Sequence, residues 1–87
     1  MRIRDLKGLG IKSEASLAAV GINSVDDFMQ ADPFAIYAKL KSQFPETNRN
    51  FIYAIIGAQE NIGWQDVAKT RKSEILMRLD DIGLAPK

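Results

Sequence analysis

Cysteine and histidine are both absent from the 87 residues, and each absence removes a class of chemistry. Without cysteine there is no disulfide framework and no thiolate metal site. Without histidine the chain lacks the commonest general base and the commonest metal ligand. Only carboxylates and lysines remain as catalytic candidates, and each has a role as a helix cap or a surface charge. We therefore predict that the protein is not an enzyme, holds no metal or cofactor and takes no small-molecule substrate.

Long apolar runs are missing as well. The longest covers residues 51–58, which is too short to span a bilayer, and no segment resembles a signal peptide. We expect a cytoplasmic protein with no membrane partner. Because 46% of the residues are apolar, residues 1–87 are expected to form one small domain with its own core.

The net charge is only +1, but charge is segregated along the sequence. Residues 1–12 carry a local charge of +3, residues 13–37 carry −4 and residues 69–78 carry +3. Such segregation is compatible with a basic face and an acidic face. It is equally compatible with separate solvated helix surfaces, because blocks in a sequence need not meet in space. In the last block, the side chains expected to be exposed are Arg71, Lys72 and Arg78.

Apolar periodicity and capping residues predict five helices and no strand. Ser24 is a good N-cap, and Asp32 followed by Pro33 is typical of a helix start. We expect an all-α fold, a compact bundle of about five short helices with one helix-hairpin-helix-like element. The expected helices begin near Ile11, Val25, Pro33, Asn50 and Asp66.

The helix over residues 50–62 is expected to be the centre of this bundle, because residues 51–56 are apolar on every side. Gly57 inside it is expected to allow a neighbouring helix, such as the one after the hairpin, to approach closely. Trp64, just before the last helix, is expected to pack on the core rather than to stack on a ligand. The predicted centre of the core is Phe51, Ile52, Ile55 and Leu76. Other positions expected to face inward are Ile11, Leu17, Val20, Val25, Phe28, Met29, Ile36, Tyr37, Leu40, Phe44, Val67, Ile75, Leu79 and Ile82.

Residues 6–22, LKGLGIKSEASLAAVGI, resemble a helix-hairpin-helix motif. Gly8 and Gly10 flank Leu9, so the backbone can reverse sharply while Leu9 points into the core. We expect Gly10 to hold a positive φ that other residues do not tolerate. Gly21 is expected to end the following helix.

The hairpin also predicts an anion site, because the N–H groups of Gly10, Ile11 and Lys12 would lie at a helix N-terminus. In the helix-hairpin-helix family the anion is a nucleic-acid phosphate, and binding does not depend on base sequence. The alternative is that the two glycines only form a connection between helices. The candidate phosphate-binding residues are Arg2, Arg4, Lys7, Gly8, Gly10, Ile11 and Lys12.

A set of short motifs spread over nearly the whole chain resembles one family. The motifs are Leu9-Gly10 with Lys12-Ser13-Glu14, Leu17-Ala18 with Val20-Gly21-Ile22, Asn50 with Tyr53-Ala54 and Gly57-Ala58, and Trp64 with Arg71-Lys72, Glu74 and Leu76. Together they are similar to the C-terminal domain of the TfoX (Sxy) family of bacterial competence regulators.

This resemblance implies an all-helical domain associated with the activation of DNA-uptake genes. Two functions are compatible with it. In the first, which we favour from the sequence, a non-enzymatic regulatory module docks on a protein of the transcription machinery. In the alternative, the module binds the DNA backbone through the hairpin and Lys12, independently of base sequence.

Overall fold

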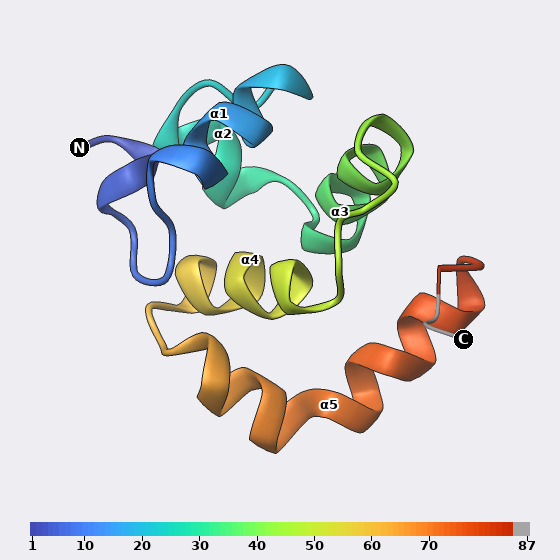
Figure 1. Ribbon diagram of the computed structural model, residues 1–87. Helices are drawn as coiled ribbons and strands as arrows, with labels where there is room; N and C mark the ends of the chain where they lie inside the picture. The colour runs from blue at the N-terminus through green and yellow to red at the C-terminus, as the bar shows by residue number, and fades with distance from the viewer. Residues whose placement is uncertain (85–87) are drawn as a thin grey trace.

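The computed structural model describes residues 1–84, and every regular element in that range is helical. A 3₁₀ helix, η1 (Ile3–Asp5), precedes five α-helices (Figure 1), which confirms the expected all-α fold. None of the helices in this range has the length and apolar character needed to cross a membrane. The α-helices are α1 (Ile11–Ala19), α2 (Val25–Gln30), α3 (Pro33–Gln43), α4 (Asn50–Glu60) and α5 (Trp64–Asp81).

Two of these helices start at the capping residues that the sequence predicts. The Ser24 hydroxyl accepts the N–H of Asp27 at 3.0 Å, and Asp32 Oδ1 accepts the N–H of Phe34 at 2.8 Å. Each side chain satisfies a backbone donor that has no partner within its helix. The starts of α2 and α3 are therefore confirmed in detail.

The end of α1 is also confirmed. Gly21 has a φ of +89°, and its N–H donates to the carbonyl oxygen of Ala18 at 3.1 Å. The N–H of Ile22 donates to the carbonyl oxygen of Leu17 at 2.9 Å. This pair of bonds is the Schellman motif, in which a left-handed glycine closes the last turn and an apolar residue packs back on the helix.

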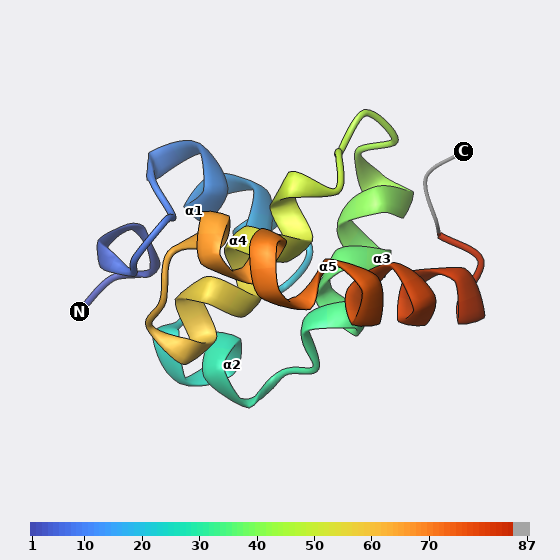
Figure 2. The same ribbon diagram turned by 90° about the horizontal axis from the view of Figure 1, so that it is seen from below.

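Helix α4 lies between α1–α3 on one side and α5 on the other (Figures 1 and 2). Ile52 and Ile55 are completely buried, which confirms their predicted place at the centre of the core. Phe51 and Leu76 are only partly buried, so their predicted central place is wrong. Leu76 lies about 100° around α5 from the fully buried Ile75, because an α-helix has 3.6 residues per turn.

Three side chains that were expected to face inward are exposed instead. Ile11 is 67% exposed, Met29 is 45% exposed and Ile82 is 49% exposed. Ile11 precedes the buried Leu17 by six residues, which places it about 120° away around α1. Met29 follows the buried Phe28 by one residue, and Ile82 lies just beyond the last residue of α5.

Gly57 makes room for the connection between α4 and α5. A Cβ atom on Gly57 would lie 2.7 Å from the carbonyl oxygen of Ile62 and 3.3 Å from the backbone nitrogen of Trp64. The close approach is therefore that of this connection, and the prediction that a neighbouring helix approaches Gly57 is wrong. The same connection places Trp64 as the first residue of α5, two residues earlier than the sequence pattern predicts.

Candidate functional site

The hairpin between η1 and α1 depends on Gly8. The N–H of Leu9 donates to the carbonyl oxygen of Leu6 at 3.1 Å, and Gly8 inside this turn has a φ of +82°. Leu9 is buried, as expected, whereas Gly10 has an extended backbone with a φ of −142° and serves as the N-cap of α1. The prediction of a positive φ at Gly10 is therefore wrong, and the conformation that favours glycine belongs to Gly8.

The different roles of the two glycines predict different effects of the same substitution. Gly8→Ser is expected to lower the free energy of unfolding by about 1–2 kcal/mol, because a side chain is strained in the left-handed region. Gly10→Ser is expected to leave stability unchanged or to raise it slightly, because serine is a favoured N-cap and no atom lies within 4 Å of a Cβ there. Urea denaturation of both variants measures the difference. A larger loss for Gly10→Ser than for Gly8→Ser would contradict this account of the hairpin.

The N-terminus of α1 presents backbone donors next to the hairpin. The first helical hydrogen bond runs from the N–H of Glu14 to the carbonyl oxygen of Gly10 at 2.9 Å. The N–H groups of Ile11, Lys12 and Ser13 have no acceptor within residues 1–84. Such donors at the positive end of a helix dipole favour an anion. The side chain of Lys12 is exposed beside them.

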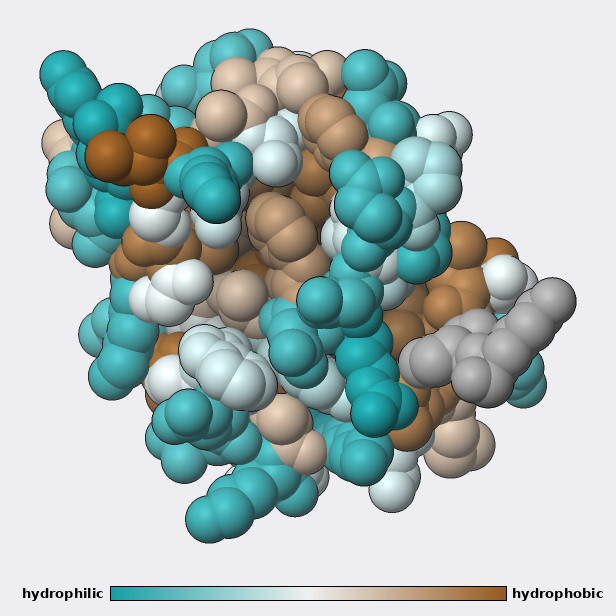
Figure 3. All heavy atoms as spheres, viewed as in Figure 1, coloured by the Kyte–Doolittle hydropathy of each residue, from teal (hydrophilic) through white to brown (hydrophobic). Residues whose placement is uncertain are grey.

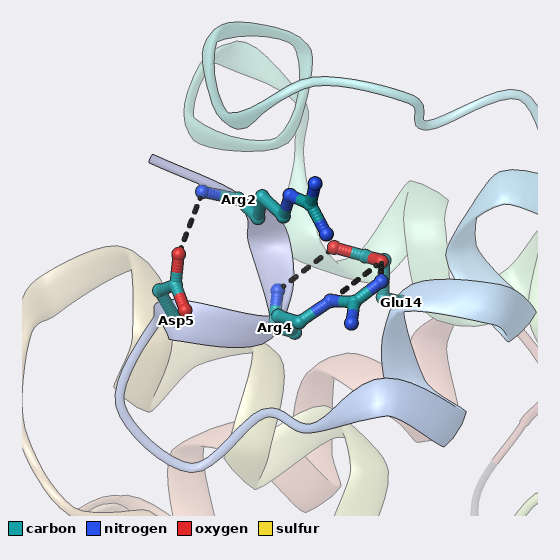
Figure 4. Close-up of polar contacts among 4 residues, drawn as sticks. All are labelled: Arg2, Arg4, Asp5 and Glu14. Atoms are coloured by element: carbon teal, nitrogen blue, oxygen red, sulfur yellow. Dashed lines mark hydrogen bonds and ion pairs between the residues drawn. The ribbon is translucent and has the colours of Figure 1, made fainter.

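Arg4 is paired with Glu14, and its side chain remains 36% exposed (Figure 4). Its Nη2 and Nε atoms donate to Glu14 Oε1 at 2.7 Å and 3.0 Å, and its backbone N–H donates to Glu14 Oε2 at 3.1 Å. These bonds hold the pKa of the Glu14 carboxyl below its ordinary value of 4.5 and raise the pKa of Arg4. The contact attaches η1 to the first turn of α1. Arg4 is therefore paired within the fold.

Arg2 lies near this ion pair. Its backbone N–H donates to Asp5 Oδ2 at 3.0 Å (Figure 4). Arg2 and Arg4 line a cavity of about 400 Å³, together with Glu14 and residues 22–25. Among the other candidate phosphate-binding residues, Gly8 lines a different hollow and Lys12 is exposed at the start of α1.

A different pair of hollows adjoins the hairpin, and Trp64 belongs to both. The smaller, of about 240 Å³, extends from Gly8 and Ser13 to Trp64 across the start of α4. The larger, of about 520 Å³, lies between the first halves of α4 and α5. We call the two hollows together the Trp64 face. Its lining residues are Gly8, Ser13, Asn48, Arg49, Asn50, Phe51, Tyr53, Ala54, Trp64, Gln65, Asp66, Ala68, Lys69 and Lys72.

This face is assembled from distant segments, because residues of the hairpin, of α1, of α4 and of α5 line the two hollows together. Figure 3 shows the surface on the side viewed in Figure 1, with hydrophobic residues toward the centre and hydrophilic residues around them. The residues that line the Trp64 face include apolar ones, such as Phe51 and Ala54, and polar ones, such as Asn48 and Lys69.

Three cations border the larger hollow without an acidic partner. Arg49, Lys69 and Lys72 form no salt bridge with any residue in the range 1–84. Asp66 is the one acidic side chain among the residues that line this hollow. The face is therefore positively charged, although the net charge of the whole chain is only +1.

Two other arginines make contacts within the fold. Arg71 forms ion pairs with Glu60 and Glu74, and the Arg78 guanidinium lies 4.2 Å from the centre of the Phe34 ring. Arg71 is partly buried, so its predicted exposure is wrong, whereas Lys72 and Arg78 are exposed as expected. The basic block over residues 69–78 is thus divided: Lys69 and Lys72 border the hollow, and Arg71 joins α5 to the end of α4.

The aromatic residues of the face are Phe51, Tyr53 and Trp64. Tyr53 is 3% exposed, and its hydroxyl has no hydrogen-bond partner within the described residues. Trp64 is 37% exposed, and a Cβ atom on Gly8 would lie 3.9 Å from its Cδ1 atom. The indole ring is therefore in contact distance of the hairpin while part of its surface remains open. No group of three acidic residues that could hold a metal ion occurs in residues 1–84.

These observations describe a small all-helical domain whose most distinctive surface is a basic hollow next to a hairpin. Residues 1–79 match the TfoX C-terminal domain. The chain belongs to the family of TfoX C-terminal domains, as its sequence motifs indicate, and this membership supports a competence-related regulatory domain.

The fold is shared with a solved structure. An uncharacterized protein from Listeria monocytogenes, determined in a triclinic crystal form, superposes with a TM-score of 0.83 over 100% of both chains. The two sequences are 17% identical, so the similarity shows a common fold alone. No curated protein matches the chain.

Proposed function

We propose that this domain is a non-enzymatic regulatory module that binds the nucleic-acid backbone through the Trp64 face and the adjoining hairpin. The observation that carries the proposal is the position of Arg49, Lys69 and Lys72, which border one hollow without acidic partners in residues 1–84. Unpaired lysine and arginine side chains are the groups that neutralise phosphates. The N–H groups at the start of α1 add further donors for a phosphate.

The proposed interface differs from the one that the sequence predicts. The proposed interface keeps Gly8 and Lys12 from the predicted set, because Gly8 lines the smaller hollow and Lys12 is exposed at the start of α1. It does not include Arg2 and Arg4, because they line the separate cavity beside Glu14. Binding of this kind fixes the position of a nucleic acid without reading its sequence, because phosphates are the same at every nucleotide.

Docking on a protein of the transcription machinery is the competing function. The large apolar side chains that such docking would use are Ile11, Met29, Met77 and Ile82, which are exposed. They lie on α1, on α2, in the second half of α5 and just after α5, whereas three cations without a salt bridge in residues 1–84 border one hollow. The arrangement of the charged side chains therefore supports nucleic-acid binding more strongly than the exposed apolar side chains support protein docking.

Salt dependence tests the proposal. With Lys12, Arg49, Lys69 and Lys72 engaged, about four phosphates are neutralised, and affinity for a DNA duplex is expected to fall roughly 100-fold between about 50 and 200 mM salt. Fluorescence anisotropy with labelled oligonucleotides of two unrelated sequences, each as a duplex and as a single strand, measures the slope. The two sequences are expected to bind equally. No binding of any of these oligonucleotides at about 50 mM salt would overturn the proposal and leave protein docking.

A further inference from the structure

Trp64 has a position that phosphate binding alone does not explain. Trp64 is the only tryptophan in the chain, and it lines both hollows of the Trp64 face. Its ring borders the hairpin at Gly8, while 37% of the residue stays accessible. A tryptophan that served only to fill the core would be expected to be buried, as Leu17, Phe28 and Ile55 are in this domain.

The larger hollow is suited to one flat, negatively charged ligand. Its volume of about 520 Å³ lies within the range of small-molecule sites, which is roughly 300–1,000 Å³. Trp64, Tyr53 and Ala68 supply apolar wall, and Arg49, Lys69 and Lys72 supply positive charge around it. A nucleotide has both matching parts, a flat base and a phosphate.

We propose that the larger hollow takes one unpaired nucleotide, with its base stacked on Trp64 and its phosphate at Arg49, Lys69 and Lys72, so that the partner is single-stranded nucleic acid. This inference rests on the proposed function and specifies the form of nucleic acid that the same face binds. Single-strand binding sites commonly combine a basic groove with aromatic side chains on which bases stack.

A duplex does not meet the same requirements. Its base faces are covered by the neighbouring base pairs, and only base edges are open in the grooves. A base can reach an indole ring only where the strand is unpaired and the base is free to turn outward. Phosphate contacts at the hairpin remain possible with a duplex, so a duplex is bound more weakly rather than excluded.

The smaller hollow extends the path of the strand toward the hairpin. It joins Trp64 to Gly8 and Ser13 across Asn48 and Asn50. Beyond it lie the N–H groups at the start of α1 and the exposed Lys12. The phosphate next to the stacked nucleotide can therefore reach donors of the hairpin, which makes the two hollows parts of one binding surface.

Trp64 fluorescence tests the inference directly, because no other tryptophan contributes to the signal. Oligothymidine is titrated into the full chain at about 50 mM salt, with a labelled duplex and thymidine monophosphate in parallel. The single strand is expected to quench Trp64 and to bind at least roughly tenfold more tightly than the duplex. Thymidine monophosphate is expected to quench only at much higher concentration, because it lacks the neighbouring phosphates.

Two variants extend the test to the stacking contact. Trp64→Leu is expected to weaken anisotropy-detected binding of the single strand about 5- to 150-fold, with much less effect on the duplex. Trp64→Phe is expected to recover part of the loss, because phenylalanine keeps an aromatic face. Thermal melting by circular dichroism shows whether each variant is folded. If Trp64→Leu does not fold, the inference is still tested by two measurements on the parent protein: the quenching of Trp64 and the ratio of its affinities for single strand and duplex.

The other outcomes separate this inference from the proposed function. Equal affinities for single strand and duplex with unchanged Trp64 fluorescence would overturn the inference and leave backbone binding intact. Thymidine monophosphate that binds as tightly as the oligonucleotide would overturn the assignment to a strand and assign the hollow to a free nucleotide. No binding of any of the three probes would overturn both proposals.

Discussion

Ile55→Ala is expected to lower the free energy of unfolding by about 2–5 kcal/mol. Ile55 is completely buried in α4, the helix that lies between α1–α3 and α5. Truncation removes buried methyl and methylene groups and leaves a cavity that the neighbouring helices can fill only in part. Because small domains have total stabilities of only about 5–15 kcal/mol, the loss should be a large share of the whole. Chemical denaturation with urea measures it.

Ile11→Ala is the matched control, because it removes the same atoms from an isoleucine that is 67% exposed. Its effect is expected to stay within about 0.5 kcal/mol, as is usual for surface substitutions. Similar losses at the two positions would contradict the placement of α4 at the centre of the core and of Ile11 outside it.

The double variant Lys69→Glu/Lys72→Glu is expected to weaken binding of nucleic acid about 100-fold at about 50 mM salt. At that concentration each lost phosphate contact removes roughly a factor of ten through counterion release. The slope of log affinity against log salt should also become less steep, by roughly one unit for each lysine. Both lysines are exposed on α5, so the fold should be unaffected. Anisotropy titrations at several salt concentrations give both quantities.

Arg2→Glu/Lys39→Glu provides the control for this variant, because it changes the net charge by the same amount. Arg2 lines the cavity beside Glu14, and Lys39 lies on α3 beside Val20. Binding is expected to weaken only slightly, through the general change in charge. An equal loss in the control variant would show that net charge, rather than the Trp64 face, determines binding.

Local signals in the sequence predict most of the fold. The capping residues Ser24 and Asp32 locate two helix starts, and Gly21 locates the end of α1. The apolar stretch of α4 predicts its burial, because a helix that is apolar on every side needs neighbours on every side. These features depend on residues within a few positions of one another, so they can be predicted from the sequence alone.

The Trp64 face depends on contacts between segments that are far apart in the sequence. Arg49 precedes α4, Lys69 and Lys72 lie on α5, and Gly8 lies in the hairpin. Their meeting is set by the packing of α4 against α5, which has no local signal. Gly57 does signal a close approach, but the sequence does not show that the connection between α4 and α5 is what approaches it. The one feature of the sequence that points to the Trp64 face is the three-residue spacing of Lys69 and Lys72, because residues three apart lie on the same side of a helix.

Ion pairing within the fold divides the cations of the basic blocks in a way that the sequence does not predict. Arg4 and Arg71 are basic in the sequence, yet Glu14 and Glu60 hold them within the fold. Both partners lie ten or more positions away, so composition gives no indication of them. The structure thus leaves Arg49, Lys69 and Lys72 as cations that border an open hollow.

The measurement that tests the central claim most directly is a map of backbone amide shifts by ¹H–¹⁵N NMR during titration with a short single-stranded oligonucleotide. The account predicts that the largest shifts occur in residues 8–13, 48–50 and 64–72, with the Trp64 indole N–H among them. Residues 36–43 of α3 should remain nearly unchanged and serve as the internal reference. Shifts confined to residues 1–5 and 22–25, around the cavity of Arg2 and Arg4, would contradict the claim that the Trp64 face binds nucleic acid.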